Sequence, residues 1–141
     1  MAKRIRSDRE KVKTICVMGW NELFTSVFSQ MGEMVLEEVS WDFRDTPISN
    51  DLINRLYAER DKVIRNLCFP AYMTKLNEYL AQLIDVGVEE DVFCEAASEV
   101  LNELDLGRNF KTEDVSRAFK RLSQGMVFGI FDDDDSDKNS I

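Results

Sequence analysis

Apolar residues recur every three or four positions along most of this chain, the spacing that lays a single apolar stripe along a helix. Only short segments, such as residues 126–131, have the composition of a strand. The pattern therefore predicts an all-α fold. The first apolar series comprises Val12, Ile15, Cys16, Leu23, Phe24, Val27, Phe28, Met31, Met34 and Val35.

Capping and breaking residues divide this pattern into separate helices. Ser7 and Glu10 have the spacing of a capping box, so we expect the first helix to begin near Ser7 and to extend to Val39. Gly19 and Gly32 leave open whether this stretch is one helix or two, because an interior glycine costs only about 1 kcal/mol relative to alanine.

A loop with aromatic residues is expected over residues 41–47, because Pro47 disfavours helix before it. Ser49 or Asn50 can cap a second helix, which should stop at Phe69-Pro70. Three further helices are expected. The third extends from Pro70 to Gly87, the fourth from Glu89-Glu90-Asp91 to before Gly107, and the fifth from Thr112 to Gly125. The predicted architecture is an irregular bundle of about five or six helices.

Length and composition indicate one hydrophobic core. The chain has 141 residues, of which 44% are apolar and 32% are charged, enough apolar surface to offset the entropy of folding. We expect residues 1–131 to form a single helical domain. Five aspartates between Asp132 and Asp137 cannot pack together, so residues 132–141 are expected to be a disordered acidic tail.

The net charge of the chain is −9, and the charged residues are distributed unevenly along the sequence. Residues 1–13 carry six basic and two acidic side chains, whereas the rest of the chain is strongly acidic and should repel nucleic acid. A nucleic-acid-associated role would therefore depend on the basic amino-terminal arm. Its cationic residues are Lys3, Arg4, Arg6, Arg9, Lys11 and Lys13.

Cysteine usage and hydropathy predict the compartment. Cys16, Cys68 and Cys94 are odd in number and have apolar neighbours, as expected for buried thiols in a reducing environment. No apolar run approaches the ~18 residues of a membrane span, and no apolar signal core follows the start of the chain. We expect the cytoplasm or the interior of an infected host cell, and the nucleus stays open.

The chain contains no histidine, which removes the side chain most used for acid–base and metal chemistry near neutral pH. It also lacks a Walker glycine loop, a dinucleotide-binding glycine fingerprint and a C-x-x-C pair. We therefore expect no enzymatic activity and no cofactor or metal.

Carboxylate chemistry is the remaining catalytic alternative. Glu33, Glu37, Glu38 and Asp42 lie on adjacent turns and slightly resemble the acidic pairs of all-helical nucleotide pyrophosphohydrolases, which bind magnesium, although the E-E-x-x-E pattern of that family is not matched. This resemblance implies a magnesium-dependent phosphohydrolase as an alternative hypothesis.

A second acidic series, Glu95, Glu99 and Glu103, has four-residue spacing opposite an apolar helix face. A solvated helix face is the expected interpretation, with a magnesium site or a surface that imitates DNA phosphates as alternatives.

The segment Gln124–Phe131 resembles the sliding-clamp-binding peptide, whose pattern is a glutamine, an aliphatic residue three positions later and two aromatic residues at the end. Gln124, Val127, Ile130 and Phe131 occupy these positions, although the family has a longer aliphatic residue at Val127 and an aromatic ring at Ile130. The resemblance implies docking to a clamp. The alternative is a last apolar segment that packs back on the bundle.

These observations favour a non-enzymatic factor, viral or phage-encoded in one form of the hypothesis, that regulates or assists another protein by binding it. Trp41 and Phe43 in the aromatic loop, and also Trp20, are the candidate contact residues, each with a core position as the alternative. The second hypothesis is a replication or transcription accessory factor that uses the basic arm or the clamp-like segment. The third is the magnesium-dependent phosphohydrolase.

Overall fold

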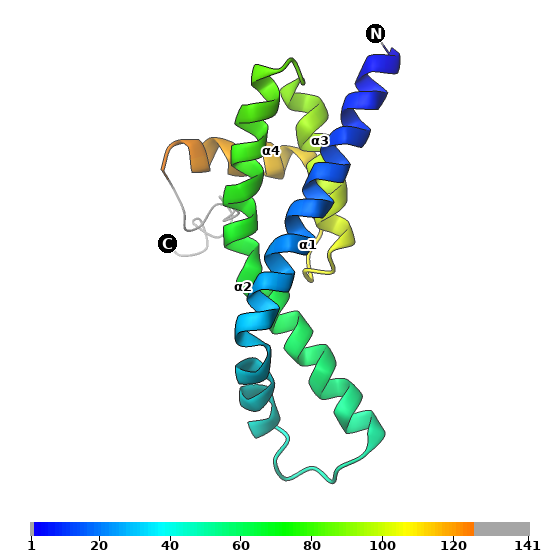
Figure 1. The fold of residues 1–141 in the computed structure, drawn as a ribbon, viewed down its shortest axis with the longest axis vertical. Coiled ribbons are helices and arrows are strands. Elements are labelled where there is room, and N and C mark those ends of the chain that lie inside the picture. The colour runs from blue at the N-terminus through cyan, green and yellow to red at the C-terminus, as the bar shows by residue number, and fades with distance from the viewer. Residues whose placement is uncertain (1, 126–141) are drawn as a thin grey trace, which may run out of the picture. The chain divides into compact units, whose positions relative to one another are not determined.

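The computed structural model describes residues 2–125, with side chains from residue 6 onward, and this part of the chain contains four helices and no strand. Figure 1 shows α1 (Ala2–Trp41), α2 (Asn50–Asp85), α3 (Glu90–Glu103) and α4 (Thr112–Ser123). The all-α prediction is confirmed, but the described residues form four helices where five or six were expected. The tail predicted over residues 132–141 lies outside the described residues.

The first correction concerns α1, which is one helix and begins at Ala2 rather than near Ser7. Alanine, lysine and arginine precede Ser7, and their high helix propensity extends the helix through the expected cap. Gly32 does not break α1, and an added Cβ there would lie 3.4 Å from the Phe28 ring. This is an ordinary van der Waals distance, so the Phe28 ring does not require a glycine at this position.

The second correction concerns α2, which continues through Pro70. Proline removes one backbone donor and usually costs about 3 kcal/mol inside a helix. Here Cys68 and Tyr72, two residues to either side, are buried, whereas Pro70 itself is exposed. We infer that packing of the flanking residues offsets the cost of the proline.

Other boundaries follow the sequence. The Ser49 Oγ accepts a 3.1 Å hydrogen bond from the Leu52 backbone amide, which confirms Ser49 as a cap of α2. Gly87 follows the carboxyl end of α2 with a φ of +99°, a conformation that glycine adopts without steric strain. Helices α3 and α4 begin at Glu90 and Thr112, close to the predicted positions.

The chain divides into two compact units, and both long helices contribute to each. We call the first the composite unit, whose described residues are 2–17 and 73–125. We call the second the hairpin unit, which consists of residues 18–72. The single domain expected over residues 1–131 stays a prediction that an unfolding experiment can test.

The composite unit has an apolar core between the carboxyl-terminal half of α2, the start of α1, and α3 with α4. Phe93 and Phe119 meet edge to face with their ring centroids 5.7 Å apart, and both are almost fully buried. The Asn102 side chain fixes the connection between α3 and α4. It accepts a 2.7 Å hydrogen bond from the Phe110 amide and donates a 2.9 Å bond to the Phe110 carbonyl.

The hairpin unit pairs residues 18–41 of α1 with residues 50–72 of α2 through a narrow apolar seam. Trp20 packs edge to face on Tyr72, with ring centroids 5.1 Å apart. The Arg60 guanidinium lies 4.7 Å from the centre of the Phe28 ring and also forms an ion pair with Asp61 at 3.1 Å. An arginine thus fills a position in the seam that an aliphatic residue would usually occupy.

None of the helices within residues 2–125 is both long enough and apolar enough to cross a membrane. Cys16, Cys68 and Cys94 are buried thiols, and none of them is in a disulfide bond, as the sequence led us to expect.

Candidate functional site

Exposed apolar side chains are concentrated on the hairpin unit. Eleven large apolar residues in the described chain are exposed, and eight of them lie in this unit. Soluble proteins scatter such residues singly, whereas a concentration of them marks a surface that contacts another molecule. The eight are Met18, Met34, Trp41, Ile48, Ile53, Tyr57, Val63 and Leu67.

A groove of about 370 Å³ runs between the two helices of the hairpin unit. Leu36, Ile53 and Leu56 supply aliphatic walls, and Tyr57, 46% exposed, adds an aromatic ring. The remaining lining residues are polar: Glu33, Glu37 and Ser40, all from α1. We call this the hairpin groove. An apolar floor beside carboxylates is suited to an apolar side chain with a cation next to it.

Two of the aromatic residues selected from the sequence lie at the tip of the hairpin unit. Trp41 is 60% exposed, and the Arg44 guanidinium lies 5.7 Å from its ring centre. Phe43 is half-buried under Arg55, whose guanidinium is 5.0 Å from the ring centre. Trp20, by contrast, is buried in the seam. The assignment of Trp41 and Phe43 to partner binding stays a prediction.

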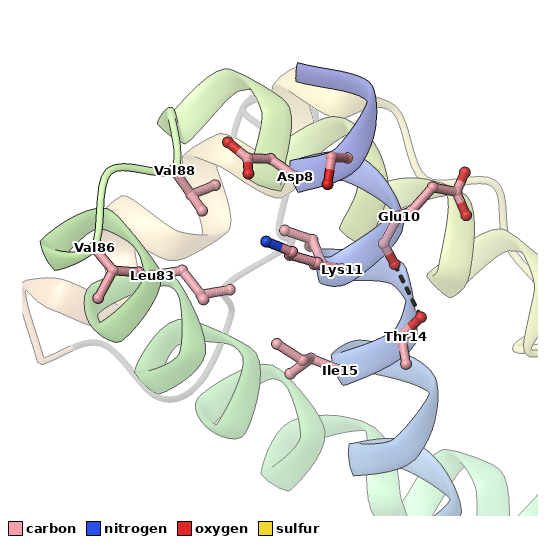
Figure 2. A pocket seen from close by; sticks show the side chains of 10 residues that line it. Asp8, Glu10, Lys11, Thr14, Ile15, Leu83, Val86 and Val88 are labelled. Atoms are coloured by element: carbon pink, nitrogen blue, oxygen red, sulfur yellow. Dashed lines mark hydrogen bonds between the residues drawn. The ribbon is translucent and has the colours of Figure 1, made fainter. Parts of the chain in front are cut away.

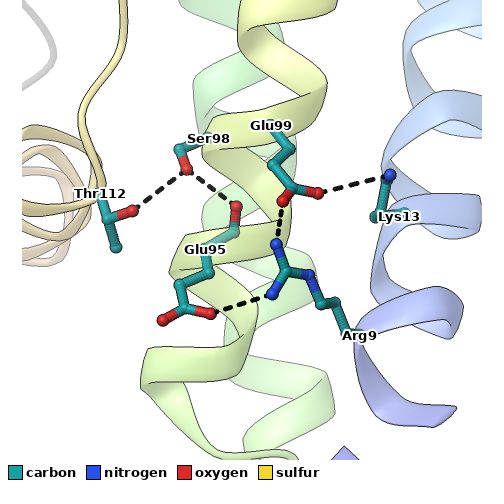
Figure 3. Close-up of polar contacts among 6 residues, drawn as sticks. All are labelled: Arg9, Lys13, Glu95, Ser98, Glu99 and Thr112. Atoms are coloured by element: carbon teal, nitrogen blue, oxygen red, sulfur yellow. Dashed lines mark hydrogen bonds and ion pairs between the residues drawn. The ribbon is translucent and has the colours of Figure 1, made fainter. Parts of the chain in front are cut away.

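The acidic series on α3 is largely exposed to water, as expected, but two of its three carboxylates also contact cations of α1. Figure 3 shows Arg9 and Lys13 from α1 extending toward Glu95 and Glu99. Arg9 bridges both carboxylates. Its Nη1 donates a 3.3 Å hydrogen bond to the Glu95 Oε2, and its Nη2 donates a hydrogen bond to the Glu99 Oε1. The Lys13 Nζ lies 3.4 Å from the Glu99 Oε2. We call these four residues the charge cluster.

This cluster divides the cations that were proposed to bind nucleic acid. Arg9 and Lys13 face carboxylates, whereas Arg6 and Lys11 are exposed. The side chains of Lys3 and Arg4 lie outside the described part of the structure. Ion pairs between exposed side chains contribute about 0–1 kcal/mol each, so these contacts are weak individually, although two of the three share Arg9.

A second apolar pocket, of about 480 Å³, lies in the composite unit. Figure 2 shows Ile15 of α1 opposite Leu83, Val86 and Val88 from the end of α2 and the turn that follows it, with Lys11 reaching across the opening. Val86 is 72% exposed. The lining also includes four polar residues: Ser7, Asp8, Glu10 and Thr14.

The thiols do not have the properties of catalytic nucleophiles at neutral pH. Burial raises the pKa of Cys16 to about 12. Burial, with the neighbouring Glu90 carboxylate, raises the pKa of Cys94 to about 11, although a hydrogen bond with Ser116 opposes this shift. Cys94 lines a polar pocket of about 410 Å³ between α3 and α4, where its thiol stays protonated. Neither residue carries the thiolate that attack on a substrate would require.

The acidic residues of the magnesium hypothesis are not gathered into a ligand set. Among the described residues, no group of three histidine, cysteine, aspartate or glutamate side chains is close enough to hold a metal ion. Glu33 and Glu37 instead line the hairpin groove, and Glu38 is an exposed residue of the same helix. Their position beside apolar residues suits the recognition of a cationic side chain better than the binding of a metal ion.

The clamp-like segment is described only at its first residue. Gln124 is exposed at the carboxyl end of α4, where its backbone amide bonds to the Lys120 carbonyl at 3.2 Å. Val127, Ile130 and Phe131 lie outside the described residues, so the clamp-binding interpretation stays a prediction.

Sequence reasoning missed the hairpin groove and the charge cluster. A signal for the cluster was present, because Arg9 and Lys13 have the same four-residue spacing as Glu95 and Glu99. The exposed apolar surface was also indicated by adjacent apolar pairs such as Leu23-Phe24. Neighbouring residues of a helix lie about 100° apart, so one narrow contact cannot bury both.

Comparison with protein-family models, with curated proteins and with solved structures gave no match.

Proposed function

We propose that this protein is a non-enzymatic interaction factor that binds a helix of another protein in the hairpin groove. The observation that carries the proposal is the hairpin groove itself, in which exposed Ile53 and Tyr57 lie beside the carboxylates of Glu33 and Glu37. A helix laid in an apolar groove between two others is a common mode of peptide recognition.

The charges of the groove define the chemistry of the partner. Residues 18–41 of α1 carry four glutamates and no basic residue, and two of those glutamates, Glu33 and Glu37, line the groove. A bound helix should therefore present apolar side chains at three- and four-residue spacing, flanked by lysine or arginine.

The other hypotheses have less structural support. Two of the six cations of the nucleic-acid hypothesis are engaged in the charge cluster, and the carboxylates of the phosphohydrolase hypothesis form no ligand set within residues 2–125. The proposal places the factor in the cytoplasm or the host-cell interior, and requires no cofactor.

A selection of displayed helical peptides tests the proposal and does not require the partner to be identified first. The immobilised full chain selects binders, and the Ile53→Asp variant removes those that bind elsewhere. We expect the retained peptides to combine an apolar face with lysine or arginine, and to bind the Glu33→Lys, Glu37→Lys double variant at least about tenfold more weakly. Val86→Asp, in the composite unit, is the matched control and should bind them normally.

The proposal would be contradicted if Ile53→Asp removed every selected peptide, or if the retained peptides bound the Glu33→Lys, Glu37→Lys double variant as tightly as the wild type. Peptides that carry acidic residues in place of lysine and arginine would contradict it as well.

A further inference from the structure

The hairpin groove continues into a second cavity along the same two helices. This cavity, of about 290 Å³, shares Glu33 and Leu36 with the groove and extends it toward Phe28 and Arg60. We call this extension the polar cavity. Its remaining lining residues are Ser29, Gln30 and Gly32.

The groove and the polar cavity form one surface, because their lining residues follow each other at three- or four-residue spacing along each helix. From Ser29 to Ser40 this surface extends about 17 Å along α1, at a rise of about 1.5 Å per residue. A bound helix of about three turns would therefore cover both. The residues that share this spacing are Ser29, Glu33, Leu36 and Ser40 on α1, and Ile53, Leu56, Tyr57 and Arg60 on α2.

Arg60 is held in place at the wall of the polar cavity. The central carbon of its guanidinium lies 4.7 Å from the centre of the Phe28 ring and 4.8 Å from the centre of the Tyr57 ring. Its Nε donates a 3.1 Å hydrogen bond to the Asp61 Oδ1, and its side chain is only 19% exposed. An arginine that is already ordered by two rings and a carboxylate has little side-chain entropy left to lose when it binds a ligand.

One edge of this guanidinium has donors to spare. The two Nη atoms of an arginine carry four of its five N–H donors. Within residues 2–125, the contact with Asp61 through Nε is the only hydrogen bond or ion pair of the Arg60 side chain. Glu33 lines the same cavity but forms no ion pair with Arg60 in this part of the chain. The described side chains also include no polar atom that is both buried and unpaired, so the Nη edge is open to solvent.

The chemistry of this edge selects a carboxylate. A planar guanidinium presents parallel N–H groups that match the two oxygens of a carboxylate, and such bidentate pairs are stronger than hydrogen bonds between neutral groups. Leu36 and the Phe28 ring beside it would exclude water from the pair and strengthen it further.

Opposite charges thus lie at two positions along one surface. Glu37 lines the groove but not the polar cavity, whereas Arg60 lines the polar cavity but not the groove. Residues that are four or seven apart return to the same face of a helix, one or two turns along its axis. A helix that satisfies both positions therefore carries a basic and an acidic residue at one of these spacings.

We propose that Arg60 binds an aspartate or glutamate of the partner helix, four or seven residues from the lysine or arginine that faces Glu37. This inference rests on the proposed function, because it concerns the same bound helix. It narrows the partner from any apolar helix with basic residues to one that also carries an acidic residue at a fixed spacing, with apolar side chains between them.

The peptides retained by the selection on the full chain provide the first test. We expect an aspartate or glutamate four or seven residues from a lysine or arginine more often among them than in the unselected library. Titration calorimetry then compares one such peptide with its version in which this acidic residue is replaced by the corresponding amide. The replacement should weaken binding to the wild type at least about tenfold, as expected for the loss of a charge-assisted pair.

The Arg60→Gln variant shows whether Arg60 is the residue that reads this carboxylate. For this variant the same replacement in the peptide should weaken binding less than about threefold, because the two changes remove the same interaction. Lys62→Gln is the matched control, since Lys62 is an exposed cation of the same helix that lines neither the groove nor the polar cavity, and it should keep the tenfold loss. Circular dichroism should show the same helix content in both variants.

Retained peptides without the acidic residue, or an amide peptide that binds the wild type as tightly as its parent, would overturn this inference. The comparison of the two peptides uses the unaltered protein, so it decides the matter even if Arg60→Gln does not fold. In either case the loss of binding in the Glu33→Lys, Glu37→Lys double variant would still support the proposed function. A selection that retains no groove-dependent peptide would remove both.

Discussion

The composite unit and the hairpin unit are built from the same two long helices, yet they differ in how completely they bury their apolar residues. The composite unit buries eighteen apolar residues and exposes three large ones, whereas the hairpin unit buries six and exposes eight. A helix contacting several neighbours can bury a wide apolar stripe, but a helix with one neighbour can bury only a narrow one. The hairpin unit therefore has apolar surface available for binding.

The largest expected effect is on the reactivity of the Cys16 thiol, which reports how readily the core of the composite unit opens to solvent. Because burial raises the pKa of Cys16 from 9.0 to about 12, its thiolate fraction at pH 8 should be about 1000-fold below that of an ordinary thiol. We expect Cys16 to react with a disulfide reagent only after unfolding, as measured by mass spectrometry of labelled peptides. Rapid labelling of native Cys16 would show that this core opens easily.

The raised pKa of Cys16 also makes the stability of the fold depend on pH. A thiol whose pKa is higher in the folded than in the unfolded protein stabilises the fold below about pH 9, and this contribution is lost as the pH rises from 9 toward 12. The Cys16→Ala variant should lack this part of the alkaline loss of stability, in urea unfolding at matched pH values.

Truncating a core residue of the composite unit should cost far more than truncating an exposed residue of the hairpin unit. Phe119→Ala removes an almost fully buried ring that packs on Phe93, and should lower the free energy of unfolding by about 3–5 kcal/mol. Trp41→Ala, at an exposed position, should change it by less than about 1 kcal/mol. Equal losses in urea unfolding would remove the distinction between the units.

The connection between α3 and α4 gives an intermediate effect. Asn102→Ala removes both hydrogen bonds to the Phe110 backbone and should lower the free energy of unfolding by about 1–3 kcal/mol. Asn109→Ala, an exposed residue in the same connection, is the control. A loss confined to Asn109→Ala would show that Asn102 does not hold this connection.

The smallest effect is expected at the charge cluster. The double variant Glu95→Gln, Glu99→Gln should lose about 1 kcal/mol or less, because the side chains are partly exposed to water. Melting curves at low and high salt test this, since salt screens the ion pairs and should reduce the difference between variant and wild type. Glu103→Gln serves as the control. A large loss that is insensitive to salt would indicate a role other than ion pairing.

The parts of the fold predicted correctly depend on local chemistry. Ser49 caps α2, Gly87 follows the end of that helix, and Thr112 begins α4, each through bonds or backbone angles set by near neighbours. The error at Pro70 involves tertiary packing. Pro70 breaks a helix by local rules, but burial of residues on both sides of it keeps α2 continuous.

The candidate sites were harder to predict because they join distant residues. Arg9 meets Glu99 across a separation of 90 residues, and the spacing of charges alone does not say which helices are neighbours. Apolar periodicity likewise placed Phe24 and Met34 in a single stripe. In the structure Phe24 packs on Trp20 in the seam while Met34 is 51% exposed, because the partner helix covers only one side of α1.

Hydrogen exchange with and without a selected helical ligand tests the central claim, that the hairpin unit is the binding surface of the molecule, most directly. We expect residues 18–72 to exchange faster than residues 73–123 in the free protein, and to gain protection when the ligand occupies the hairpin groove. Helices α3 and α4 should exchange at the same rate with and without the ligand. A hairpin unit that is as protected as α3 in the free protein and does not respond to the ligand would contradict the account.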